Sequence, residues 1–218
     1  MSLGIILLLI SYLIGSIPVG FLLGKIKGTD IRKEGSGNIG STNVTRTLGK
    51  KFGAITWLCD ILKGVVVIAL VYLLEAVTPW RNPFAIGEES LYIVYGLAAV
   101  VGHVFPIFLN FKGGKAVSTT MGAIAITFPL AAIIGLCVYL ILMFITGIVS
   151  LSSSIGALVA SISSIVLYGI GILDNSLFSS LFTIILFLLI AFRHIENYKR
   201  LINGTEYSFK KKKKENNE

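Results

Sequence analysis

Charged residues are scarce in this sequence. Of its 218 residues only 14% are Asp, Glu, Lys or Arg, while 55% are hydrophobic. Soluble domains average about 25% charged and about 45–50% apolar residues. The composition therefore excludes a disordered chain and an ordinary soluble domain, and it indicates a polytopic membrane protein.

The sequence also has few residues of the kinds that build redox, metal or hydrolase sites. Its two cysteines, Cys59 and Cys137, lie in apolar runs and form no C-x-x-C motif, so neither a disulfide nor a zinc site is predicted. No G-x-S-x-G nucleophile elbow occurs, and the acidic residues do not cluster as metal ligands would. We therefore expect no metal and no cofactor.

Apolar runs are abundant and predict an all-α bundle of seven transmembrane helices, each needing about 20 residues. The stretch 116–149 holds no charge and would be about 51 Å long as one helix, against a hydrocarbon core of about 30 Å. A break near Phe128–Pro129 makes it the fourth and fifth spans. The other five are at about Leu3–Leu23, Phe52–Leu74, Leu91–Asn110, Ile155–Leu173 and Leu177–Phe192.

The positive charges set the orientation. With seven spans, every Lys and Arg except Lys63 and Arg81 falls on one side of the membrane. The positive-inside rule then places the N-terminus outside and the C-terminus in the cytoplasm. We expect one membrane domain over residues 1–207 and a basic, disordered tail over 208–218, whose Lys210–Lys214 run binds anionic headgroups.

Three ionisable residues lie within predicted spans. Asp60 and Lys63 are three positions apart on one helix, which favours a neutralising pair facing the bundle interior over a functional site. For His103 we favour a hydrogen bond between helices over a direct chemical role.

The first polar segment, Glu34–Arg46, follows the first span. Its residues 35–40 match G-x-G-x-x-G, but no strand precedes them, so a dinucleotide fold is excluded. Glycine N–H groups, hydroxyls, an amide and an arginine are nevertheless suited to an anion. The alternative is a flexible, solvated loop. The candidate ligands are Ser36, Gly37, Asn38, Gly40, Thr42, Asn43 and Arg46.

The second polar segment, Gly102–Lys115, joins the third and fourth spans. Gly113 and Gly114 precede Lys115 at a predicted helix start, where free N–H groups favour an anion. It is not a Walker loop, because Leu109 stands where the first glycine would be. A tight turn with ordinary inner-side lysines is the alternative.

The third segment, Arg193–Glu206, follows the last span. On a continuing helix, residues 193, 197 and 200 share a face and His194 can join Asn197. The alternative is a basic helix on anionic lipid. The serines at 150 and 152–154 are expected to cap the sixth helix, with anion binding at that helix start as the less favoured option.

These segments carry a resemblance to a known family. The stretches 36–46 (SGNIGSTNVTR), 102–115 (GHVFPIFLNFKGGK) and 193–206 (RHIENYKRLINGTE), in this order, resemble the bacterial membrane-bound glycerol-3-phosphate acyltransferases that use acyl phosphate. The resemblance covers the chain to about Tyr207. Ala116, Ser118 and Tyr198 depart from the family pattern at positions without an assigned role.

The resemblance implies a reaction: transfer of a fatty acyl group from acyl phosphate to the sn-1 hydroxyl of glycerol 3-phosphate, giving lysophosphatidate and phosphate in phospholipid synthesis. It also implies a bacterial plasma-membrane location, a cytoplasmic active site and a separate soluble enzyme that supplies acyl phosphate. The expected partners are these substrates and membrane lipids, not nucleic acid. A small transporter or a non-catalytic lipid-binding protein is the alternative class.

The roles expected within that reaction follow the polar segments. Ser36, Thr42, Asn43 and Arg46 hold a phosphate and polarise the carbonyl, and the turn before Lys115 binds a second phosphate. Asn197 and Arg200 orient glycerol phosphate with Ser150 or Ser153, and His194 is a general base or a phosphate ligand. All three segments must then converge at one cytoplasmic site. The expected catalytic residues are Ser36, Arg46, Lys115 and His194.

Overall fold

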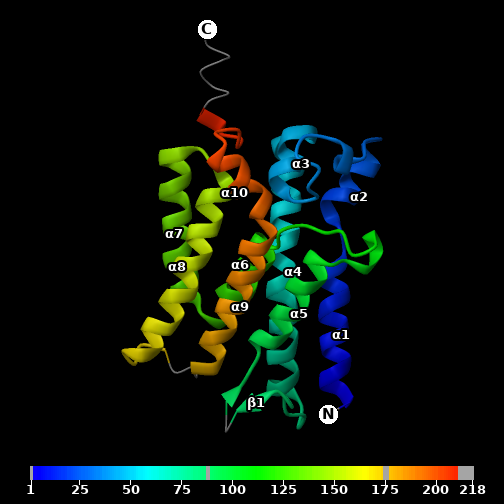
Figure 1. Cartoon of the computed structure of the whole chain (residues 1–218). Helices are drawn as coiled ribbons and strands as arrows, with labels where there is room; N and C mark the ends of the chain where they lie inside the picture. Colours follow the sequence, from blue (N-terminus) through cyan, green and yellow to red (C-terminus); the bar gives the residue numbers. More distant parts are fainter. Residues whose placement is uncertain (1, 87–88, 174–176, 211–218) are drawn as a thin grey trace. The chain divides into compact units, whose positions relative to one another are not determined.

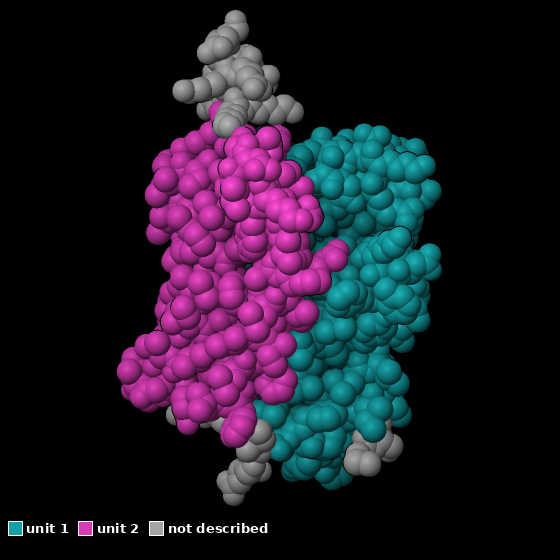
Figure 2. Space-filling model, viewed as in Figure 1, with its two compact units in different colours: residues 1–127 teal, residues 128–218 magenta. Residues whose placement is uncertain are grey.

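The computed structural model is largely helical, and it describes residues 2–86, 89–173 and 177–210. The chain divides into two compact units, residues 1–127 (unit 1) and residues 128–218 (unit 2), which Figure 2 colours separately. The single domain expected for residues 1–207 stays a prediction.

Unit 1 is built on one long helix, α4, with short helices and loops at its ends. The helices α2 and α3 lie at one end of α4, and a hairpin of two short strands lies at the other (Figure 1). The elements are α1 (Ser2–Ser16), α2 (Val19–Ile26), the 3₁₀ turn η1 (Ile31–Lys33), α3 (Ser41–Leu48), α4 (Lys50–Val77), β1 (Ala85–Ile86), β2 (Glu89–Ser90), α5 (Ile93–Val104), the 3₁₀ turn η2 (Ile107–Leu109) and α6 (Val117–Thr127).

Close backbone contacts hold the helices of unit 1 together. A side chain at Gly15 would overlap the main chain of Ala99, and one at Gly102 would overlap the main chain of Tyr12. The Tyr12 hydroxyl also donates to the Phe105 carbonyl at 2.8 Å. Small residues therefore allow α1 and α5 to pack more closely than larger side chains would permit.

Unit 2 contains α7 (Pro129–Thr146), α8 (Val149–Gly169), α9 (Leu177–Arg193) and α10 (Ile195–Ile202). The expected break at Phe128–Pro129 is confirmed, because α6 ends at Thr127 and α7 begins at Pro129. Proline suits that first position, since the first N–H of a helix has no partner inside the helix.

Among the residues that the structure describes, four helical stretches are long and apolar enough to cross a membrane: Leu3–Ile26, Lys50–Val77, Pro129–Thr146 and Val149–Gly169. The bent pair α9 and α10 would make a fifth. Each of the seven predicted runs contains a helix, but α5 and α6 have only 12 and 11 residues and reach about 17–18 Å. The count of seven spans and the orientation stay predictions.

Candidate active site

The first polar segment is a loop folded around the side chain of Asn43. This buried amide donates to the carbonyls of Ile31 and Glu34, both at 3.0 Å, and accepts from the Ser36 N–H at 2.8 Å. Gly35 and Gly37 have φ of +55° and +70°, which a residue with a side chain adopts only at a cost. Asn43 therefore shapes the loop, and its predicted contact with substrate stays a prediction.

The loop leads into the N-terminus of α3. The Asn38 side chain accepts the Gly40 N–H at 2.8 Å, and Gly40 is the residue that precedes α3. The first N–H groups of any helix lack partners inside the helix and attract anions. Thr42 and Arg46 lie four residues apart, on one side of α3. Two of the predicted phosphate ligands thus share a helix face next to a helix N-terminus.

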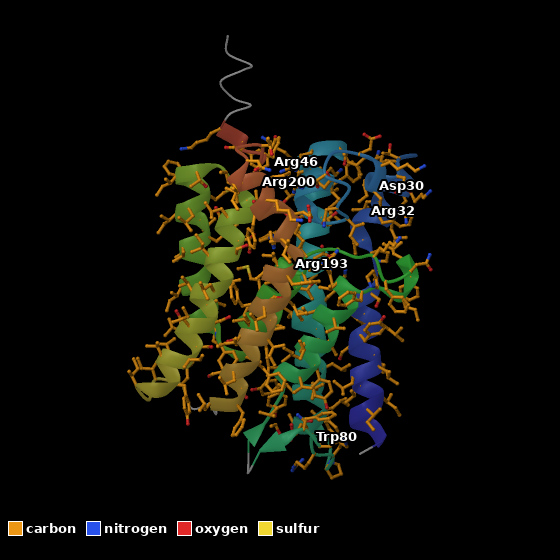
Figure 3. All side chains as sticks on the ribbon, viewed as in Figure 1. Asp30, Arg32, Arg46, Trp80, Arg193 and Arg200 are labelled. Atoms are coloured by element: carbon orange, nitrogen blue, oxygen red, sulfur yellow. The ribbon has the colours of Figure 1, made fainter. Side chains whose placement is uncertain are left out.

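Arg46 lies at the end of unit 1 that also carries Asp30 and Arg32, and Trp80 lies at the opposite end (Figure 3). Asp30 binds the Arg32 guanidinium at 2.7 Å, and this hydrogen bond holds the pKa of the Asp30 carboxyl well below its ordinary value.

The second polar segment turns back against the end of α5. The Gly113 N–H donates to the Val104 carbonyl at 3.1 Å, and the Gly114 N–H donates to the His103 carbonyl at 3.0 Å. Helix α6 begins only at Val117. The expectation that these two N–H groups start a helix and are free for an anion is therefore wrong, because two carbonyls at the end of α5 accept hydrogen bonds from them. Substrate binding by Gly113, Gly114 and Lys115 stays a prediction.

The first and second segments meet inside unit 1. Leu109 of η2 packs with Ile31 and Ile39 of the first loop and with Val44 of α3, and all four side chains are buried. Segments some 70 residues apart in the chain therefore share one small apolar core. The two segments therefore pack against each other in unit 1, and the convergence of all three segments at one cytoplasmic site stays a prediction.

The ionisable residues inside the predicted spans form one buried cluster. Lys63 Nζ lies 2.7 Å from Asp60 Oδ1, and both residues are buried, as predicted for a neutralising pair. His103 Nδ1 lies 3.4 Å from the Thr119 hydroxyl, which links α5 to α6. The interhelical role expected for His103 is confirmed.

In unit 2 the third segment is organised by a carboxylate, Glu206. Its Oε1 accepts from the Ser150 hydroxyl at 2.8 Å and from Asn197 Nδ2 at 2.7 Å, and its Oε2 accepts from Arg200 Nε at 2.8 Å. We call these four residues the Glu206 cluster. Three of its members, all but Glu206, were expected to orient glycerol phosphate, and the structure brings them together.

Burial alone would raise the pKa of Glu206, but hydrogen bonds from Asn197, Arg200 and Ser150 outweigh it and hold that pKa below its ordinary value. Glu206 thus stays an acceptor for its three donors. Sequence reasoning assigned it no role. The signal was present, since it is an acidic residue closing a cation-rich stretch.

His194 stands at a sharp bend between α9 and α10. The two helix axes differ by 55°, so the expectation of one continuing helix is wrong. The residue adopts φ −101° and ψ 1°, outside the helix, and no glycine or proline marks the break. The bend still leaves Asn197 and Arg200 on one side of α10, one turn apart, where both reach Glu206.

The His194 ring has defined partners in its own unit. Nδ1 lies 2.8 Å from the Ile190 carbonyl, and Nε2 lies 3.5 Å from the Ser153 hydroxyl. A carbonyl only accepts, so Nδ1 carries a proton. Nε2 is then the one ring atom that can take up a further proton, and it faces Ser153, another predicted ligand.

The serines after the fifth predicted span are not helix caps. Helix α8 begins at Val149, earlier than expected, so the serines lie inside its first two turns. The Ser152 hydroxyl bonds back to the Ile148 carbonyl, and the Ser153 and Ser154 hydroxyls bond back to the Ser150 carbonyl. The capping interpretation is therefore wrong, and Ser150 binds Glu206 instead.

The chain after Glu206 packs over the turn between α7 and α8. The Ser208 hydroxyl donates to the Thr146 carbonyl at 3.1 Å, the Phe209 N–H to the Gly147 carbonyl at 3.0 Å, and Lys210 Nζ to the Ile145 carbonyl at 2.7 Å. Residues 208–210, which were expected to be disordered, thus pack against the turn between α7 and α8, and residues 211–218 lie outside the described chain.

Comparison with known proteins decides between the possible classes. A family model described as glycerol-3-phosphate acyltransferase matches residues 5–204. Glycerol-3-phosphate acyltransferases of Desulfotalea psychrophila and Bacillus subtilis are 43% and 41% identical, over 94% and 92% of this chain and 97% and 95% of theirs. The chain belongs to the glycerol-3-phosphate acyltransferase family.

A solved structure agrees with this placement. The crystal structure of PlsY (YgiH), an integral membrane glycerol 3-phosphate acyltransferase, in its glycerol 3-phosphate form, matches with a TM-score of 0.80 and 36% identity. The match covers 94% of this acyltransferase and 95% of that chain. A second PlsY structure holds lysophosphatidic acid and matches with a TM-score of 0.77. The helical membrane fold expected from the sequence is confirmed, apart from the short β1–β2 hairpin of unit 1.

Proposed function

We propose that the two groups of polar residues bind the two phosphorylated substrates of one acyl transfer. The chain is a glycerol-3-phosphate acyltransferase, which moves a fatty acyl group from acyl phosphate to the sn-1 hydroxyl of glycerol 3-phosphate and releases lysophosphatidate and phosphate. The observation that carries the assignment of sites is the Glu206 cluster of unit 2.

The Glu206 cluster is suited to orient glycerol 3-phosphate. Glu206 binds Arg200 through Nε, which fixes the guanidinium plane, and the Arg200 side chain is 43% exposed. A fixed guanidinium presents its terminal N–H groups to phosphate as a fork. Asn197 and Ser150, held by the same carboxylate, place an amide and a hydroxyl beside it for the glycerol oxygens.

The loop and helix α3 of unit 1 are suited to acyl phosphate. Thr42 and Arg46 share a face of α3, and the N–H groups of its first turn favour a phosphate dianion. The Ser36 hydroxyl extends from the loop that Asn43 holds. We assign these groups, with Gly37, Asn38 and Gly40, to the donor phosphate and the carbonyl, and Lys115 after its glycine turn to the second phosphate.

In the reaction the sn-1 oxygen forms a bond to the acyl carbon, the bond from that carbon to the phosphate oxygen breaks, and phosphate departs with the electron pair. Acyl phosphate is an activated anhydride, so positioning and charge stabilisation supply most of the rate. The hydroxyl proton passes to His194 Nε2 or to a phosphate oxygen. His194→Gln distinguishes these two proton acceptors. If His194 is the general base, its loss lowers kcat by about 10²-fold or more.

The remaining parts of the proposal concern the membrane. Seven spans with an outer N-terminus and a cytoplasmic C-terminus follow from the one-sided distribution of Lys and Arg. The reaction then takes place on the cytoplasmic face of the bacterial plasma membrane, among anionic lipids. A separate soluble enzyme supplies acyl phosphate.

One assay tests the reaction and the donor together. Purified protein receives labelled glycerol 3-phosphate with acyl phosphate, acyl-CoA or acyl carrier protein in parallel, and labelled lysophosphatidate is measured. We expect product with acyl phosphate alone, and its loss in Arg46→Ala and Lys115→Ala without loss of the protein from the membrane. Product from acyl-CoA only, or full activity in both variants, would contradict the proposal.

A further inference from the structure

A charged pair inside α4 has no part in the proposed chemistry. Asp60 and Lys63 are 3% and 5% exposed, and their side chains are in contact at 2.7 Å. Charges within a membrane-spanning helix are costly and usually mark a function. A buried ion pair is also weak evidence for stability, because apolar replacements are often neutral or stabilising. The pair therefore requires an account beyond packing.

The pair connects several elements of unit 1. Lys63 Nζ donates to the carbonyl of Ile17, which lies at the break between α1 and α2. Asp60 Oδ1 lies 3.7 Å from His103 Nδ1. That distance is too long for a hydrogen bond, but in apolar surroundings a carboxylate beside Nδ1 favours the proton on that nitrogen. The Thr119 hydroxyl lies 3.4 Å from the same nitrogen.

His103 in turn defines the path of the glycine turn. Its carbonyl accepts the Gly114 N–H at 3.0 Å. A side chain at Gly114 would overlap Nε2 of the His103 ring, whereas one at Gly113 would overlap the carbonyl of His103 and the ring of Pro106. The ring thus occupies the space next to Gly114, and the backbone occupies the space next to Gly113.

The turn leads directly to Lys115. Ala116 follows with φ of +59°, an uncommon conformation for a residue with a side chain. Lys115 therefore leaves the turn along a constrained path, with glycines fixed against His103 before it and a left-handed residue after it.

We propose that His103 is a positioning residue, held by the Asp60–Lys63 ion pair, that fixes the Gly113–Gly114 turn and thereby the place of Lys115. The inference rests on the proposed function for the role of Lys115 and deepens it.

The contact between ring and turn is tested by compensation. Gly114→Ala places a methyl group against Nε2, and a displacement of about 1 Å near the chemistry can cost about 10²-fold in activity. Adding His103→Ala removes the obstacle. We expect the double variant to be at least tenfold more active than Gly114→Ala alone, and Gly113→Ala, which meets backbone, to gain nothing from His103→Ala. If the loss of activity in the Gly114→Ala/His103→Ala double variant equals the product of the losses in the two single variants, the proposed contact between the His103 ring and the turn is overturned.

The role of the ion pair is tested by hydrogen exchange in detergent-purified protein. Asp60→Leu with Lys63→Met removes both charges, while Asp60→Asn with Lys63→Met keeps an oxygen beside His103. We expect the Gly113 and Gly114 amides to exchange at least tenfold faster in the first variant than in the second. Thr56→Val, at a buried α4 position whose hydroxyl bonds only within the helix, should not change their exchange.

Equal exchange of these amides in the two paired variants and the wild type would overturn the positioning role. The KM for each substrate is then measured in the same variants. Faster exchange together with unchanged kinetics would support the positioning of the turn and overturn the proposed role of Lys115, so the two failures are distinguishable.

Discussion

The polar groups of the two units are built in different ways. In unit 2 one carboxylate, Glu206, holds three side chains from α8 and α10 directly. In unit 1 the side chain of Asn43 holds main-chain groups of a loop, and the glycine turn is held by carbonyls at the end of α5. The Glu206 carboxylate fixes the positions of side chains, whereas the Asn43 amide fixes the positions of main-chain groups. Substitution of Glu206 should therefore lower activity directly, and substitution of Asn43 should first destabilise its loop.

The contrast is tested most strongly at Glu206. Glu206→Ala removes the acceptor of Ser150, Asn197 and Arg200 together, so we expect acyl transfer to fall by about 10²-fold or more. Glu206→Gln keeps one acceptor oxygen and should retain more activity. Steady-state rates measure both. Glu196→Ala is the control, since the salt bridge of Glu196 is with exposed Lys199, and an equal loss there would contradict the assignment.

Asn43 should give the next largest effect. Asn43→Ala removes three hydrogen bonds, two to the carbonyls of Ile31 and Glu34 and one from the Ser36 N–H, and each such bond is worth about 0.5–1.5 kcal/mol. We expect a lower thermal midpoint and faster proteolysis within residues 31–40, followed by loss of activity. Thr47→Val on the same helix, whose hydroxyl bonds only to the Asn43 carbonyl, is the control. Unchanged proteolysis within residues 31–40 in Asn43→Ala would contradict the role of Asn43 in holding this loop.

Arg200→Lys should change the KM for one of the two substrates. Lysine keeps the charge but not the fork that binds Glu206 and phosphate together. We expect the KM for glycerol 3-phosphate to rise about tenfold with the KM for acyl phosphate unchanged. A rise in the KM for acyl phosphate instead would move the donor site to unit 2.

The smallest expected effect is on pH dependence. The pKa of Glu206 is lower in the folded protein than its ordinary value of 4.5. Its stabilising contribution is therefore complete above pH 4.5 and is lost as the pH falls through the lower, folded value. Thermal midpoints of the wild type and of Glu206→Gln should converge as the pH falls below 4.5, and a constant difference would contradict this.

Much of the fold followed from simple patterns. The helix break at Phe128–Pro129 was readable because proline restricts the chain locally, and the Asp60–Lys63 pair was readable because charges in a span need a partner. The bend at His194 was not, since no breaker residue marks it. The early start of α8 at Val149 was missed because serines resemble caps.

The site was predictable in its residues more than in their roles. Ser150, Asn197 and Arg200 do lie together, but their common partner Glu206 was overlooked. Roles were assigned to side chains that can bind phosphate, and a carboxylate is not one of them. The same reasoning gave Gly113 and Gly114 free N–H groups, although the carbonyls that bind them become visible only in three dimensions.

The most direct test of the account is the binding of glycerol 3-phosphate alone, measured by calorimetry on purified Arg200→Ala and Arg46→Ala variants. Loss of a fork to phosphate in the Glu206 cluster should raise the dissociation constant at least tenfold in Arg200→Ala, while Arg46→Ala binds as the wild type does. Weak binding in Arg46→Ala with normal binding in Arg200→Ala would contradict the assignment of glycerol 3-phosphate to Arg200 and of acyl phosphate to Arg46.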